Sequence, residues 1–99
     1  MTFYEAQHGY GGHYGVHTFL VTDDVLYARE QILKEMHHQM GAKNFKESFR
    51  AFDDKFQEFL KDEERGLYFR VRDCDYHYAL RIAQLRVAVT PLSTIQRST

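Results

Sequence analysis

Six histidines give this 99-residue sequence its most reactive side chains. Three of them, His8, His13 and His17, surround a glycine-rich stretch at residues 9–15. Neutral imidazole is a good ligand for zinc, copper and nickel. However, the spacing matches no established zinc pattern, and no cysteine lies among the three histidines. We therefore expect ordinary surface and hairpin side chains and no cofactor, with a metal site at His8, His13 and His17 as the alternative.

The stretch 9–15 also combines glycine with tyrosine. Glycine lets a backbone approach a ligand closely, but a phosphate-binding loop would need a following helix or a nearby lysine, and neither is expected at this point of the chain. Tyrosine and glycine together are typical of adaptable recognition loops. The segment is interpreted as a plain hairpin turn, or else as a contact surface formed by Tyr10, His13 and Tyr14.

An acidic run lies in the second half of the chain. Six carboxylates fall within twelve residues, namely Asp53, Asp54, Glu58, Asp62, Glu63 and Glu64. The last three stand where we expect a helix to end, and negative charge at that end opposes the helix dipole. The run is either a solvated surface or an electrostatic docking site for a partner rich in lysine and arginine.

Basic residues dominate the last third of the chain. Residues 1–64 carry twelve Asp/Glu against seven Lys/Arg, whereas residues 65–99 carry six arginines against two aspartates. A strand with Tyr68, Arg70 and Arg72 on one side would suit single-stranded nucleic acid or an acidic protein surface. Because the whole chain has a net charge of −1, pairing of these arginines with the acidic run is the simpler interpretation.

No set of residues has the spacing of an active site. The single cysteine, Cys74, excludes an internal disulfide, and its two flanking aspartates disfavour the thiolate. No serine, histidine and aspartate order and no pair of glutamates suggests catalysis. We therefore expect a protein that is not an enzyme.

Local patterns predict the elements that would position these residues. Alternation on either side of the glycines predicts a β-hairpin from residues 2–8 and 14–21. A helix should begin near Asp24 and end at Gly41, and a second helix should begin at Asn44. This second helix, at residues 44–61, carries an apolar stripe that we expect to fill the core. The stripe consists of Phe45, Phe49, Phe52, Phe56 and Phe59.

The C-terminal third contains one clear strand and one ambiguous segment. Residues 67–72 alternate, with Leu67, Phe69 and Val71 facing inward. Residues 75–86 fit a helix capped by Asp75, but alternate positions in 76–82 also fit a strand. We predict the helix and keep the strand as the alternative. Residues 92–99 are polar and without periodicity, which predicts a flexible tail.

These elements predict one small α+β domain over residues 1–91, with an αα-hairpin packed on one face of a small sheet. The chain shows no secretory signal and no apolar run of membrane-spanning length, so we expect a cytoplasmic protein in a bacterial or other host cell. The preferred hypothesis is a non-enzymatic binding protein that docks to a protein partner, such as a phage- or mobile-element-type inhibitor of host machinery. The alternatives are a nucleic-acid-binding module using the arginine/tyrosine strand and a histidine-rich metal-binding protein. Open sheet edges would also allow a homodimer.

Overall fold

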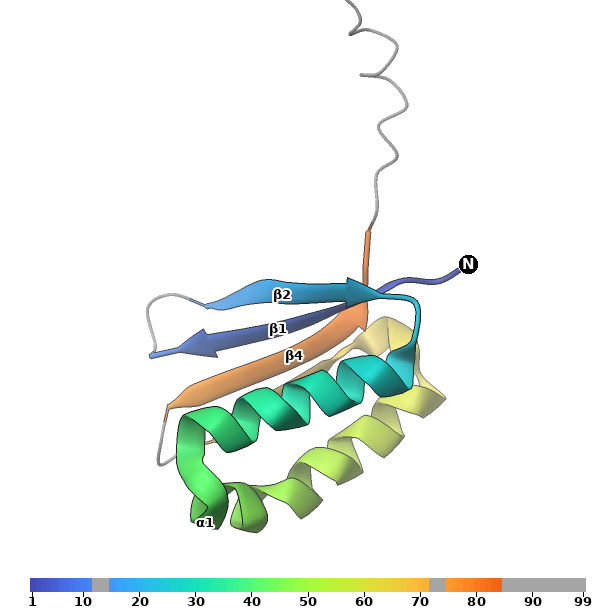
Figure 1. The fold of residues 1–99 in the computed structure, drawn as a ribbon. Coiled ribbons are helices and arrows are strands. Elements are labelled where there is room, and N and C mark those ends of the chain that lie inside the picture. Colours follow the sequence, from blue (N-terminus) through green and yellow to red (C-terminus); the bar gives the residue numbers. More distant parts are fainter. Residues whose placement is uncertain (12–14, 72–74, 85–99) are drawn as a thin grey trace, which may run out of the picture.

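The computed structural model describes residues 1–11, 15–71 and 75–84. It is an α+β domain in which a β-hairpin, a long helix and a second β-hairpin follow one another (Figure 1). The elements are β1 (Tyr4–Tyr10), β2 (Val16–Thr22), α1 (Val25–Lys61), the short 3-10 helix η1 (Glu63–Arg65), β3 (Leu67–Val71) and β4 (Tyr76–Ile82). The strands form one four-stranded antiparallel sheet in the order β2-β1-β4-β3. The tail expected at 92–99 lies outside the described residues.

The first hairpin forms, but its strands are shifted along the chain: β1 extends through Gly9 and Tyr10, which were expected in the turn, and β2 runs from Val16 to Thr22. β1 and β2 pair with Tyr4 opposite Thr22 and His8 opposite His17. The register shifts between Ala6 and Gln7, so that Phe19 is an additional residue on β2. Such a bulge bends the strand locally and increases its twist.

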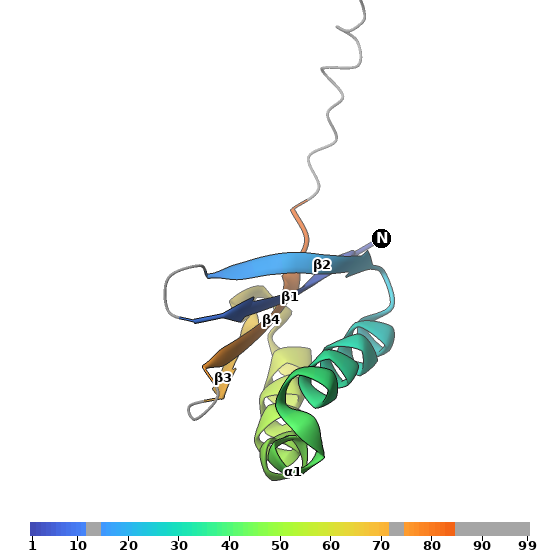
Figure 2. The same ribbon diagram turned by 60° about the vertical axis from the view of Figure 1, so that its left-hand side comes forward.

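The helix α1 begins at the expected cap and is interrupted at the expected glycine. The side chain of Asp24 accepts hydrogen bonds from the backbone N–H groups of Leu26 and Tyr27. Gly41 has φ 83° and ψ 163°, a conformation that only glycine adopts readily. Figures 1 and 2 show that the helix turns there and that its second arm returns beside the first. An ion pair between Arg29 and Asp53, 3.0 Å long, joins the two arms.

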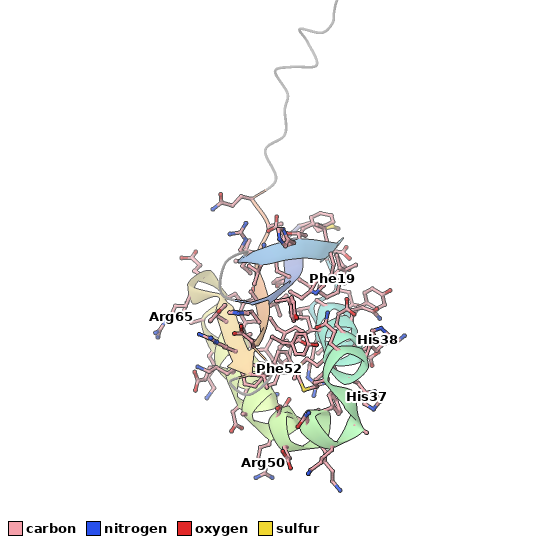
Figure 3. All side chains as sticks on the ribbon, turned by 90° about the vertical axis from the view of Figure 1, so that its left-hand side faces the viewer. Phe19, His37, His38, Arg50, Phe52 and Arg65 are labelled. Carbon is pink, nitrogen blue, oxygen red and sulfur yellow. The ribbon has the colours of Figure 1, made fainter. Side chains whose placement is uncertain are left out.

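The core lies between α1 and the sheet, and only part of the phenylalanine stripe belongs to it. Phe52, Phe56 and Phe59 are buried, and Phe52 points from α1 toward the sheet (Figure 3). Phe49, however, is 37% exposed and Phe45 is only half-buried. Phe45 still packs against the core, but Phe49 does not belong to it, so the expectation that all five rings fill the core was wrong for Phe49.

The two outer rings differ because they face the first arm of α1 and not the sheet. Phe45 packs edge-on against His37, with ring centroids 5.1 Å apart, and the guanidinium of Arg29 lies 5.9 Å from the ring of Phe49. In contrast, Phe52 contacts Phe69 of β3, with ring centroids 5.7 Å apart.

The strand predicted at 67–72 is confirmed over Leu67–Val71, but the helix predicted at 75–86 was wrong. Residues Tyr76–Ile82 form β4, which pairs with β1 on one side and β3 on the other. Backbone hydrogen bonds on both sides of a central strand outweigh the weak local preference for helix. Asp75 is not a helix cap: its φ is +56°, and its N–H donates to the carbonyl of Val71 across the turn.

We predict that Phe52→Ala lowers the free energy of unfolding by about 3–5 kcal/mol, because it leaves a cavity in a fully buried site. Phe49→Ala removes the same ring from a position that is 37% exposed, and it should cost only about 1 kcal/mol. Urea denaturation of the two variants checks this. Equal losses would mean that the ring of Phe49 contributes as much to the core as the ring of Phe52.

Gly41→Ala should also be destabilising, by about 1–3 kcal/mol, because alanine is strained at this backbone conformation. A β-carbon at Gly41 would meet no atom within 4 Å, so the loss would come from the backbone alone and not from a clash. Thermal and urea unfolding measure it. A variant as stable as the wild type would show that α1 can continue through this position without turning.

Candidate functional site

The sheet has one face covered by α1 and one face that no described element covers, as Figure 2 shows. Tyr4 contacts Phe59, and Tyr78 donates a hydrogen bond to Gln39, so these strand residues face the helix. Since side chains alternate along a strand, their sequence neighbours point to the opposite face. The uncovered face is formed by Glu5, Gln7, Thr18, Val21, Tyr68, Arg70, His77, Ala79 and Arg81.

Tyr68 of the edge strand β3 and His77 of the adjoining strand β4 lie together on this face. The tyrosine hydroxyl is hydrogen-bonded to Nδ1 of His77, and Tyr68 nevertheless remains 53% exposed. His77 is only 6% exposed, and its Nε2 is buried without a hydrogen-bond partner. The closest carboxylate oxygen, Oδ1 of Asp75, lies 3.7 Å from it. The result is a large aromatic side chain fixed in place by a buried imidazole.

Two ion pairs lie on either side of Tyr68 and His77. Arg81 on β4 lies directly opposite Glu5 on β1, and its Nε donates to a carboxylate oxygen at 2.9 Å. The guanidinium of Arg70 donates to Oδ1 of Asp75, also at 2.9 Å. Because Asp75 holds a positive φ, this pair sits on a strained backbone. The expected pairing of these arginines with the acidic run was therefore wrong: each uses a carboxylate of the sheet or of its adjoining turn.

The acidic run divides into engaged and free carboxylates. Asp53 pairs with Arg29, and Glu63 accepts a hydrogen bond of 2.8 Å from the hydroxyl of Tyr4. The other four are exposed, and within the described part of the chain they form no ion pair. They are Asp54, Glu58, Asp62 and Glu64. The first three recur every four residues, so they mark one solvent-facing side of the second arm of α1.

The residues proposed from sequence at the hairpin tip are only partly placed. Tyr10 is 64% exposed and packs against Tyr76, with ring centroids 5.5 Å apart. His13, Tyr14, Arg72 and Cys74 lie outside the described residues. The structure thus brings Tyr68 and Arg70 together on one face, and it places the acidic run on the helical layer. His77 was not proposed for this face from the sequence. In a strand, however, His77 lies between Tyr76 and Tyr78, whose side chains point toward the helix, so its own side chain must point to the opposite face.

A second polar group lies between β1 and the first arm of α1. The hydroxyl of Tyr78 donates to Oε1 of Gln39 at 2.6 Å, and the amide of Gln39 contacts Nδ1 of His8 at 3.1 Å. Nε2 of His8 lies 3.8 Å from a carboxylate oxygen of Glu35. Among residues 1–11, 15–71 and 75–84, no three histidine, cysteine, aspartate or glutamate side chains already stand in position to hold a metal ion.

Comparison with protein-family models, with curated proteins and with solved structures gives no match to this chain. The helical part of the described residues contains no segment long and apolar enough to span a membrane. The site must therefore be interpreted from its own geometry.

The contact between Tyr4 and Glu63 gives a prediction about pH. Burial raises the pKa of Tyr4 above its ordinary value of 10.0, and its hydrogen bond to the charged Glu63 raises it further. A pKa that is higher in the folded state contributes stability that is complete below pH 10 and is lost as the pH rises through the folded value. Glu63→Gln should therefore lower the pKa of Tyr4, measured by NMR of the tyrosine rings.

Glu64→Gln is the matched control, because it removes the same charge from the next residue, which is exposed. It should leave the titration of Tyr4 close to that of the wild type. An equal effect of the two variants would show that Glu63 does not act through its hydrogen bond.

Proposed function

We propose that this chain is a non-catalytic binding protein that docks to a protein partner through the uncovered face of its sheet. The observation that carries the proposal is the half-exposed Tyr68, held by His77 and flanked by the pairs Arg70–Asp75 and Arg81–Glu5. Tyrosine and arginine are the residues most enriched among those that dominate binding energy. Aromatic side chains and arginine are also enriched in protein interfaces relative to the rest of the surface.

The hydrogen bond between Tyr68 and His77 supports this role energetically. A side chain that is already ordered loses less conformational entropy when a partner covers it, so more of the contact energy appears as affinity. The Arg70–Asp75 pair is exposed on both sides, with side-chain accessibilities of 53% and 42%, whereas Glu5 of the other pair is only 17% accessible. Exposed pairs contribute only about 0–1 kcal/mol, so a partner can replace Asp75 at little cost.

The charge of this face favours a protein over a nucleic acid. Each arginine has a carboxylate within hydrogen-bond distance, so the described part of the face presents both signs of charge. A polyanion would meet Glu5 and Asp75 together with the arginines, and like charges oppose its approach. A protein surface can present both signs in complementary positions.

The arrangement around His77 also argues for binding rather than catalysis. General acid or base catalysis requires a titratable atom within hydrogen-bond reach of a substrate. Nε2 of His77 is buried, and Nδ1 is occupied by Tyr68. The imidazole therefore supports Tyr68 and presents no free nitrogen to solvent.

Affinity capture from the organism that encodes the chain, with quantitative mass spectrometry, tests the proposal. Tyr68→Ala should reduce the captured partner about tenfold or more, which corresponds to a loss of at least about 1.4 kcal/mol. Tyr27→Ala is the matched control, since Tyr27 is a similarly exposed tyrosine, at 47%, on α1. Arg70→Ala and Arg50→Ala form a second pair, because Arg50 points away from the sheet (Figure 3).

The pattern of loss among these variants identifies which surface binds the partner. Loss with Tyr68→Ala and Arg70→Ala alone supports the sheet face, provided that circular dichroism shows both variants folded. Loss with Glu58→Lys alone would instead assign docking to the acidic side of α1. Equal capture by all variants would reject both surfaces, and retention on oligonucleotides at low salt, lost with Arg70→Ala, would favour a nucleic acid.

A further inference from the structure

A shallow hollow lies at the end of the sheet where the first hairpin turns. It is lined by His8, Gly9, Tyr10, His17, Gln39 and Tyr76. Two imidazoles thus open onto the same space, and neither belongs to the uncovered face of the sheet. His8 is 30% accessible, and His17 is exposed, so both can be reached by an ion from solvent.

The backbone places these two histidines as neighbours. His8 and His17 are directly opposite in the register of β1 and β2. Residues opposite each other in an antiparallel pair point to the same face, with Cβ atoms about 4.5–5.5 Å apart. Two imidazoles at that separation can each bring one nitrogen to about 2.0–2.1 Å from a common metal ion.

His8 contacts groups on two other elements, and one of these groups is held by a third element. Phe19 of β2 packs edge-on against its ring, with centroids 4.9 Å apart. On the other side, Gln39 of α1 contacts Nδ1 and is itself held by Tyr78 of β4. A hydrogen bond to the second ring nitrogen is the usual means by which proteins orient a metal-binding histidine. Oε1 of Gln39 accepts from Tyr78, so Nε2 of the amide faces Nδ1 of His8. Turning the amide over presents Oε1 to a protonated Nδ1, with the Tyr78 hydroxyl accepting from the amide, and leaves Nε2 of His8 free to bind.

Glu35 provides a carboxylate at the free side of His8. Its Oε2 lies 3.8 Å from Nε2 of His8, somewhat longer than the separation of about 3.3 Å between two ligand atoms around one tetrahedral zinc ion. The imidazole of His17 does not complete the set in this structure, because no three such groups are positioned to hold a metal ion within the described residues. Its side chain is exposed, so rotation about its χ angles meets little obstruction and can bring the second imidazole in.

From this geometry we infer that His8, His17 and Glu35 form a binding site for a divalent transition-metal ion such as Zn²⁺, with water completing the coordination. Two imidazole nitrogens and one carboxylate are a donor set that Zn²⁺ accepts, whereas Ca²⁺ and Mg²⁺ prefer oxygen ligands. The ion would join β1, β2 and α1 at one point. It would therefore stabilise the folded chain by a free energy that grows with the logarithm of the ion concentration once this exceeds the Kd.

Titration of the untagged, full-length protein with Zn²⁺ alone tests this site, by calorimetry and by NMR of the imidazole groups. We expect one ion per chain and shifts in the signals of His8 and His17. His17→Gln should weaken the affinity about tenfold or more, and Glu35→Gln should weaken it as well. The midpoint of thermal unfolding should rise with Zn²⁺ in the wild type and not in His17→Gln.

His38→Gln is the matched control, because His38 is an exposed histidine on α1 (Figure 3) and does not line the hollow. It should bind Zn²⁺ as the wild type does. Since His17 is exposed, His17→Gln should fold normally. The NMR shifts of His8 on addition of Zn²⁺ are measured in the wild type, so this second readout does not depend on any variant. Equal affinity of His17→Gln and the wild type, or imidazole shifts at His38 with none at His8, would overturn the inference.

Discussion

β1 pairs with β2 on one side and with β4 on the other, and every other feature of the fold depends on this double pairing. The contact between β1 and β4 joins residues near the two ends of the described chain, with Ala6 opposite Leu80. It converts two separate hairpins into a single sheet, which is large enough to support α1. A two-stranded hairpin alone is at best marginally stable in water, so the second hairpin supplies what the first one lacks.

The sheet and α1 form two layers, and this has one unavoidable consequence: one face of the sheet is left without a helix. Both arms of α1 cover the other face, where Ile32, Met36, Phe52, Phe56 and Phe59 form one core with the apolar side chains of the strands. The uncovered face carries polar groups that are hydrogen-bonded to one another, although Nε2 of His77 has no hydrogen-bond partner. Within the described residues, its one large exposed aromatic side chain is Tyr68. The proposed docking role follows from this asymmetry, because the same architecture that stabilises the core leaves Tyr68 exposed.

Sequence patterns predicted the structure correctly where it depends on residues only a few positions apart. Asp24 caps α1 with its own side chain, and Gly41 interrupts the helix because its backbone conformation suits glycine alone. The alternation of Leu67 and Phe69 gave the correct face of β3. The prediction failed at 75–86, where alternation and helical spacing were both present and only pairing with two neighbouring strands could decide between them. It also failed for Phe49, whose neighbour is the first arm of α1, a contact that spacing along one helix does not contain.

The amino-acid sequence by itself therefore determined the first hairpin, the two arms of the helix with their turn, and the inward side of β3, because each depends on neighbours a few residues away. Only the tertiary structure decided that Tyr76–Ile82 is a strand, that Arg70 and Arg81 pair with Asp75 and Glu5, and that Tyr68 rests on His77. It likewise brought Glu35 of α1 beside His8 of β1. These contacts join residues from different elements, and they exist only after β1 and β4 have paired, so no local pattern could specify them.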